Sequence, residues 1–233
     1  MAPVVTQVLD PVTLGEGPHW HSEEEALYFV SVSDSELHKY EPETGKHVWV
    51  KLDVKPHFIL PIEGKKNHFL ITQSRKVVEI EWFGDEKPPK ILRTITEVDQ
   101  DFPNNVFNDG KADPLGRLYT ANPRVAFSLE EHGVEGFPDG MTIDTAGNLW
   151  VAVFGGSSVI KVDPRKNTLL ETIPIPTKQV TSVTFGGPNL DVLYVTTGCI
   201  DFGGKSGPPG GATFAVTGIN ARGHPNLKVR VDD

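Results

Sequence analysis

The sequence predicts an all-β protein of the β-propeller class, and three observations carry that prediction. Short runs rich in Val, Ile, Leu, Thr and aromatic residues alternate with turn residues, and 23 glycines and 19 prolines are spread along the 233 residues. Because Gly and Pro interrupt regular structure, this pattern is typical of many short strands. Amphipathic helical patterns longer than two turns are absent. A turn–aromatic–strand phrase also recurs along the chain, as expected for repeated blades.

The repeated phrase has five copies. They begin at Ala26, His68, Gly116, Gly147 and Asp191, and most continue through a second turn into a second strand. Their anchor residues Leu27, Phe69, Leu118, Leu149 and Leu193 follow one another at intervals of 42, 49, 31 and 44 residues. A four-stranded blade takes ~40–50 residues, so three intervals fit. A β-sandwich of about seven strands is the alternative, but it does not explain the repeat.

The 31-residue interval is too short for a blade. Four strands of ~5 residues with their turns need nearer 40. We therefore expect a segment of roughly one and a half blades to be missing between Tyr119 and Phe137. The prediction is a single domain over residues 1–233, with a deletion near 120–130 and about four to five blades.

Composition limits the partners and the compartment. The chain carries 22 basic and 31 acidic residues, a net charge of −9 with pI ≈ 5.4, and no basic run. This charge disfavours nucleic acid and anionic membrane surfaces, and no stretch of ~18 apolar residues predicts a membrane helix. A single cysteine, Cys199, and an N-terminus unlike a signal peptide favour the cytoplasm.

Three segments place an oxygen-bearing side chain, Glu16, Asn108 or Asp139, beside glycines or prolines that let the backbone turn tightly. Asp-Gly and Asn-Asp-Gly are common turn formers, so each segment alone indicates a turn more strongly than a site. Glu16 differs, because a carboxylate in an otherwise apolar segment costs free energy unless a cation meets it. A hard cation with oxygen ligands is the simplest candidate. The Asp144-Thr-Ala-Gly segment predicts a hairpin turn.

A family resemblance rests on four segments in chain order. They are Gly15 to Trp20, Phe107 to Gly116, Pro138 to Ala152, and Val180 to Val195. Together they resemble the SMP-30/gluconolactonase/luciferin-regenerating-enzyme family, whose members include regucalcins. The resemblance implies a six-bladed propeller with one divalent metal ion (Ca²⁺, Zn²⁺, Mn²⁺ or Mg²⁺) at the mouth of its channel. It also implies hydrolytic opening of sugar-type lactones.

The resemblance assigns roles to the three candidates. Glu16 matches a metal ligand, Asp139 matches a metal ligand that is also the catalytic acid and base, and Asn108 matches a residue that contacts substrate. The chemistry is coherent, because a carboxylate beside a polarising cation can accept the proton of an attacking water.

Three departures from the family pattern qualify those roles. A metal-binding Asn and a substrate-binding Glu of the family have no counterpart here, and both fall in the interval that is too short. A substrate-contacting Arg is replaced by Val106, which cannot donate a hydrogen bond to a sugar hydroxyl.

Two functional classes therefore stay open. The first is a metal-dependent lactone hydrolase acting on a small-molecule lactone. The second is a non-catalytic calcium-binding regulatory protein or an inactive shortened isoform. Because missing blades would expose apolar faces and sheet edges, we also expect self-association through the exposed blade edges.

Overall fold

The computed structural model describes residues 2–98, 111–112, 118–119, 127–201, 207 and 209–231. Within these ranges the chain forms strands throughout, and the one helical turn is η1 (Glu130–His132). The predicted all-β fold is confirmed. No helix in the described ranges is long and apolar enough to cross a membrane.

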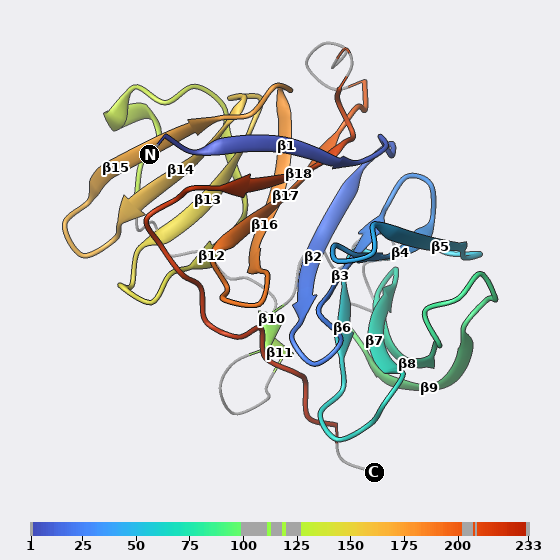
Figure 1. The fold of residues 1–233 in the computed structure, drawn as a ribbon. Helices are drawn as coiled ribbons and strands as arrows, with labels where there is room; N and C mark the ends of the chain where they lie inside the picture. The colour runs from blue at the N-terminus through green and yellow to red at the C-terminus, as the bar shows by residue number, and fades with distance from the viewer. Residues whose placement is uncertain are drawn as a thin grey trace.

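The described strands fall into four antiparallel units of four strands (Figure 1), and the third and fourth units join into one eight-stranded sheet through the pairing of Phe154 with Gln179. The first contains β2 (Gly15–His21), β3 (Ala26–Ser31), β4 (Glu36–Glu41) and β5 (Lys46–Lys51). The second contains β6 (Ile59–Pro61), β7 (His68–Gln73), β8 (Lys76–Glu81) and β9 (Lys90–Glu97). The third contains β12 (Phe137–Ile143), β13 (Leu149–Phe154), β14 (Ser158–Asp163) and β15 (Thr168–Pro174).

The fourth unit joins the two ends of the chain. It contains β16 (Gln179–Gly186), β17 (Val192–Gly198) and β18 (Thr213–Thr217), and β1 (Val4–Leu9) completes it by pairing with β18. In Figure 1 the first strand accordingly lies beside the last. One further pair, β10 (Lys111–Ala112) with β11 (Leu118–Tyr119), stands apart from these units.

The four units follow one another around an arc because each shares an apolar interface with the next. The third packs on the fourth through a cluster that includes Trp150 and Phe185. The fourth packs on the first through Trp20 and Tyr194, whose rings stack with centroids 5.6 Å apart. The first packs on the second through a cluster that includes Tyr28. This arrangement is an incomplete β-propeller, as the repeat predicted.

The two outer faces of the arc are partly covered by neighbouring chain. Alternate residues of a strand point to opposite faces, so Val151 and Val153 face away from the fourth unit, and Phe127, Leu129 and Val134 pack on that face. At the other end, residues on the free face of the second unit pack against Val229 and Val231. The prediction of self-association stays untested.

The C-terminal segment, residues 219–231, crosses the molecule from the third and fourth units to the second (Figure 1). Gly223 bridges Asp144, and the Asn226 side chain donates a hydrogen bond of 2.8 Å to Thr184 Oγ1 on β16. Val229 then bridges Ile62 beside β6 and exchanges backbone hydrogen bonds with Pro61 and Glu63. The segment therefore ties together the two ends of the arc.

The first unit buries a pair of histidines. His38 Nδ1 lies 3.0 Å from His47 Nε2, and the His38 ring stacks on Phe29 with centroids 4.5 Å apart. Burial lowers the pKa of His38 to about 3, and the neighbouring His47 adds to the effect. The folded protein therefore keeps His38 neutral over the whole physiological range.

This burial predicts a loss of stability in mild acid. The unfolded chain protonates His38 near pH 6.5 and the folded chain only near pH 3, so folding stability falls as the pH drops from about 6.5 toward 3. At pH 5 the loss from this group is about 2 kcal/mol. His38→Phe keeps the stacking and removes the titration, so chemical denaturation at pH 7 and pH 5 should show a smaller difference for that variant. His224→Phe, at an exposed position, should behave as the wild type does, and an unchanged difference in His38→Phe would contradict the assignment.

Candidate functional site

Three inner strands, β2, β12 and β16, run side by side in the same direction. Thr181 Oγ1 on β16 donates a hydrogen bond of 2.6 Å to Gly15 O on β2, and Ser182 lies against Gly140 on β12. Further along, Trp20 packs against Gly186, and Phe185 packs against Gly223, which bridges Asp144 at the end of β12. We call the first set of positions (15–16, 139–140 and 181–182) the upper level of the channel, and the second set (19–20, 142–144 and 184–186) the lower level.

Glu16 and Asp139 both lie at the upper level, on either side of β16. The two segments are far apart in sequence, and their close contacts with Thr181 and Ser182 bring them to one place. Both carboxylate residues are half-buried and make contacts in the structure. The fold therefore brings the segments of Glu16 and Asp139 to the same part of β16, and their roles in a site stay a prediction.

Each of the three strands is irregular at this level. The pairing register shifts between Glu16 and His19 in β2, between Pro138 and Met141 in β12, and between Val180 and Ser182 in β16. Such β-bulges bend a strand and redirect its side chains, and they are common beside functional sites. The bulges thus lie at the positions of Glu16 and Asp139.

Glycines make the close approach of these strands possible. A Cβ on Gly140 would lie 2.0 Å from Ser182 Oγ and 2.8 Å from Ser182 Cα. Gly17 has a φ of +54° and abuts the second unit, where a Cβ would lie 2.9 Å from His57 O and from Phe58 Cα. A side chain at either position would push an inner strand out of place.

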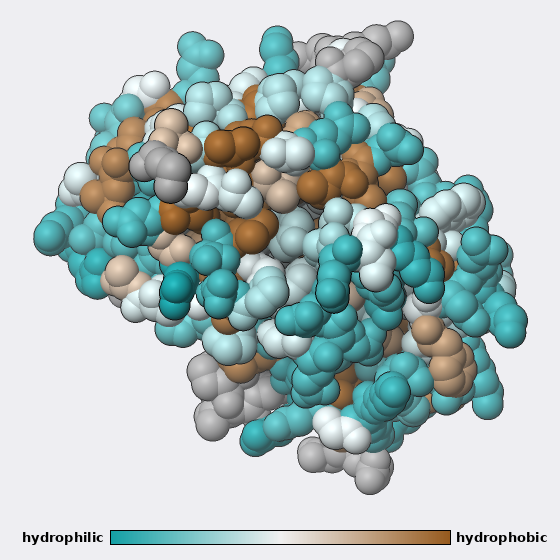
Figure 2. All heavy atoms as spheres, in the orientation of Figure 1, coloured by the Kyte–Doolittle hydropathy of each residue, from teal (hydrophilic) through white to brown (hydrophobic). Residues whose placement is uncertain are grey.

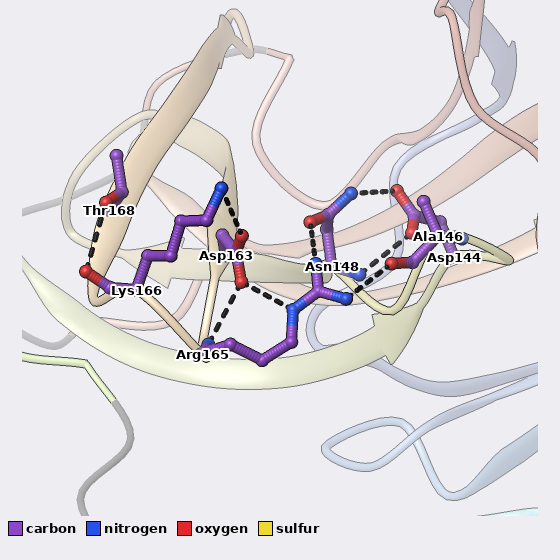
Figure 3. A network of polar contacts seen from close by, with 7 residues as sticks. All are labelled: Asp144, Ala146, Asn148, Asp163, Arg165, Lys166 and Thr168. Carbon is purple, nitrogen blue, oxygen red and sulfur yellow. Dashed lines mark hydrogen bonds and ion pairs between the residues drawn. The ribbon is translucent and has the colours of Figure 1, made fainter.

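The far end of β12 is anchored by the turn that the sequence predicted at Asp144 (Figure 3). Asp144 Oδ1 accepts hydrogen bonds from the backbone of Ala146 and Asn148, and Asp144 Oδ2 accepts one of 3.1 Å from the Trp150 indole. Arg165 bonds Asn148 Oδ1 and Asp163 Oδ1, which links this hairpin to the next one. The hairpin prediction is confirmed, and the side chain of Asp144 stabilises the turn.

Burial alone would raise the pKa of Asp144, but its partners reverse the effect. Hydrogen bonds from the Asn148 backbone, the Trp150 indole and the Asn148 side chain, with the charge of Lys161, lower it below the ordinary value. Lys161 Nζ lies 3.4 Å from Asp144 Oδ2. Asp144 is therefore a charged, fully committed carboxylate that holds the strand carrying Asp139.

Sequence reasoning missed Thr181 and Ser182, and it placed Asn108 in a segment outside the described residues. Thr181 Oγ1 is engaged by Gly15 O and Thr196 Oγ1. Ser182 Oγ is buried and has no hydrogen-bond partner among the described residues. Both hydroxyls lie in the Val180 to Val195 segment. The one signal for them in the sequence was that they follow directly on the start of a predicted strand.

The upper level offers hard oxygen donors. Two carboxylates with a neighbouring buried hydroxyl suit a divalent cation that prefers oxygen ligands. In the described part of the chain no three His, Cys, Asp or Glu side chains are grouped closely enough to hold an ion by themselves. The donor chemistry fits a metal, and a third ligand has to come from elsewhere.

Comparison with known proteins gives a family match over most of the chain. The family described as "SMP-30/Gluconolactonase/LRE-like region" matches residues 14–128 and 119–199 in two overlapping parts. The chain is 30% identical to "Pentonolactonase XacC" of Haloferax volcanii, with 96% of this chain and 97% of that protein covered. It is 25% identical to "Regucalcin" of Xenopus laevis, with 93% and 94% covered.

Those two alignments extend over 297 and 291 positions, against 233 residues in this chain. Among solved structures, a luciferin-regenerating enzyme superposes with a TM-score of 0.92 and 32% identity, covering 99% of this chain and 100% of that one. The predicted resemblance is confirmed.

The contact between Gly140 and Ser182 gives a direct test of how the upper level is built. We expect Gly140→Ala to lower the free energy of unfolding by about 1–3 kcal/mol, because the new methyl group overlaps Ser182 and its backbone cannot move aside cheaply. Denaturant titration measures the change. Gly207→Ala adds the same methyl group where no atom of the described residues lies within 4 Å, so it should leave stability nearly unchanged. Equal stability of the two variants would refute the contact.

Proposed function

Because this chain belongs to the SMP-30/gluconolactonase/LRE-like family, we propose that it is a hydrolase that opens sugar-type lactones with the help of a divalent metal ion. The observation that carries the proposal is that Gly15 and Gly140, the neighbours of Glu16 and Asp139, contact the adjacent residues Thr181 and Ser182 of β16. Relatives named as a pentonolactonase and as a sugar lactone lactonase support the substrate class.

Glu16 and Asp139 would hold the ion, which could be Ca²⁺, Zn²⁺, Mn²⁺ or Mg²⁺. When bound, such an ion supplies polarisation of the lactone carbonyl. Asp139 has a second task, because its carboxylate accepts a proton from the attacking water as the water oxygen bonds to the acyl carbon. The acyl–oxygen bond of the ring then breaks, and Asp139 returns the proton to the departing ring oxygen. The product is the open hydroxy acid, and atoms balance with one water consumed.

Asn108 keeps its proposed role as a donor to substrate, since an amide can both donate and accept hydrogen bonds with a lactone. Its position lies outside the described residues, so that role rests on the family resemblance alone.

We also propose that this single-domain chain lacks an internal segment of its relatives near residues 120–130. The two parts of the family match overlap at 119–128, and both alignments run more than fifty positions beyond the length of this chain. The second candidate function, calcium binding without catalysis, draws support from the same feature. A site that has lost one ligand can bind a metal weakly without the geometry that catalysis needs.

Removing either carboxylate separates these functions. In the wild type, Ca²⁺ or Mn²⁺ added after chelation should raise the unfolding midpoint, because a ligand that binds the native state stabilises it. Glu16→Gln and Asp139→Asn should abolish that rise. Hydrolysis of glucono-δ-lactone, followed by acid release, should fall at least about 100-fold in Asp139→Asn with the loss of its proton-transfer group.

Glu171→Gln is the matched control, because Glu171 lies on β15, the outer strand of the unit that carries Asp139. It should keep both the metal response and the activity. A metal response without hydrolysis of any lactone would favour the calcium-binding alternative. A wild type that shows neither would overturn both functions.

A further inference from the structure

A second feature of the molecule is an apolar pocket of about 360 Å³ beside the lower level of the inner strands. It is lined by His19 from β2, by Met141 to Ile143 from β12, by Leu149, and by residues 224–227 of the C-terminal segment. Small-molecule pockets are typically a few hundred cubic ångströms or more in volume and mostly apolar, with a few polar groups that fix orientation. Here His19 and Asn226 are among the polar groups.

Large apolar side chains that line this pocket are only partly covered by the rest of the protein. Met141 is 44% exposed, Ile143 45% and Leu227 38%. Met141 pairs with Val151 and Ile143 with Leu149, so both point to the face of the third unit that is turned away from the fourth. Figure 2 shows hydrophobic residues gathered mainly over the half of the molecule built from β12 to β18, whereas hydrophilic ones cover most of the half with β4 to β9.

The wall contributed by the C-terminal segment is held in place on both sides of the pocket. Asn226 is hydrogen-bonded to Thr184 on β16, and three residues on, Val229 is buried against the second unit. Lys228 forms an ion pair of 2.7 Å with Glu23. A wall fixed in this way is pre-formed, which reduces the entropy lost when a ligand binds.

The pocket and the candidate site share two strands. Glu16 precedes His19 on β2, and Asp139 precedes Ile143 by four residues on β12. At ~3.3 Å per residue the two levels are on the order of 10–13 Å apart. One elongated ligand can therefore reach both.

We propose that the pocket binds an apolar substituent of the ligand whose lactone ring lies at the upper level. The proposal rests on the proposed lactone hydrolysis and names the substrate class further: lactones whose ring carries an alkyl chain of several methylene groups. The hydroxyls of a sugar lactone would find few partners among Met141, Ile143 and Leu227, and burying them unpaired is costly. A sugar lactone therefore fills the upper level alone.

Chain length gives the kinetic test. We expect kcat/KM to rise from δ-valerolactone through δ-octalactone to δ-decalactone, by about sixteenfold between the last two, because they differ by two methylenes and each buried methylene contributes about fourfold. Ile143→Trp fills the pocket at a half-exposed position and should remove the advantage of δ-decalactone over δ-valerolactone. Leu170→Trp is the control, since Leu170 is 49% exposed on β15, outside the pocket lining.

A binding measurement keeps the pocket separable from catalysis. The chain has two methionines, Met1 and Met141, so labelling with [methyl-¹³C]methionine gives one resonance from the pocket, assigned with Met141→Leu. The probe is 2-pentyltetrahydropyran, which has the alkyl chain but no carbonyl to hydrolyse. It should shift the Met141 resonance in the wild type and in Leu170→Trp, but not in Ile143→Trp.

The outcomes distinguish the two proposals. A shifted Met141 resonance together with the chain-length preference supports both. Lactone opening without any chain-length preference or shift overturns the pocket and leaves the hydrolase standing. A shift that Ile143→Trp abolishes, in a protein that opens no lactone, supports the pocket and overturns the hydrolase.

Discussion

The near contact of three inner strand backbones is the constraint on which the rest of the structure depends. Gly140 lies so close to Ser182 that no side chain fits between them, and Gly15 is held to Thr181 by a short hydrogen bond. If these strands moved apart by the width of one methyl group, the segments that carry Glu16 and Asp139 would lose their contacts with β16. The bulges follow from the same crowding, because an extra residue in each strand relieves the pairing where the strands converge.

Packing of the units supports this convergence. Three apolar interfaces fix the order of the units, and each uses side chains on alternate positions of the same strands. A unit whose two faces are both apolar needs a neighbour on each side. At the two ends of the arc that need is met in part by short segments, residues 127–134 at one end and the C-terminal segment at the other. These short segments thus cover part of the apolar surface that neighbouring blades would cover in a complete ring.

How much of this the sequence predicts depends on the range of the interactions. The hairpin at Asp144 and the strands after Leu27 and Leu193 are set by local turn chemistry and periodicity, and sequence reasoning found them. The pairing of Glu16 with Asp139 was assigned by resemblance. The course of the C-terminal segment and the contact of Ser182 with Gly140 arise between residues far apart in the chain, for which a single sequence has no local signal.

The shared strands couple the two levels of the channel in a definite way. Asp144 fixes the lower end of β12 through its turn and through Lys161, while Gly140 fixes the upper end against β16. Asp139 and Ile143 therefore belong to one short strand clamped at both ends, and a ligand that contacts both is matched to a rigid spacing. A clamped strand cannot adjust to ligands of different length. The proposed selectivity for lactones with an alkyl chain would therefore follow from the backbone as much as from the side chains that line the pocket.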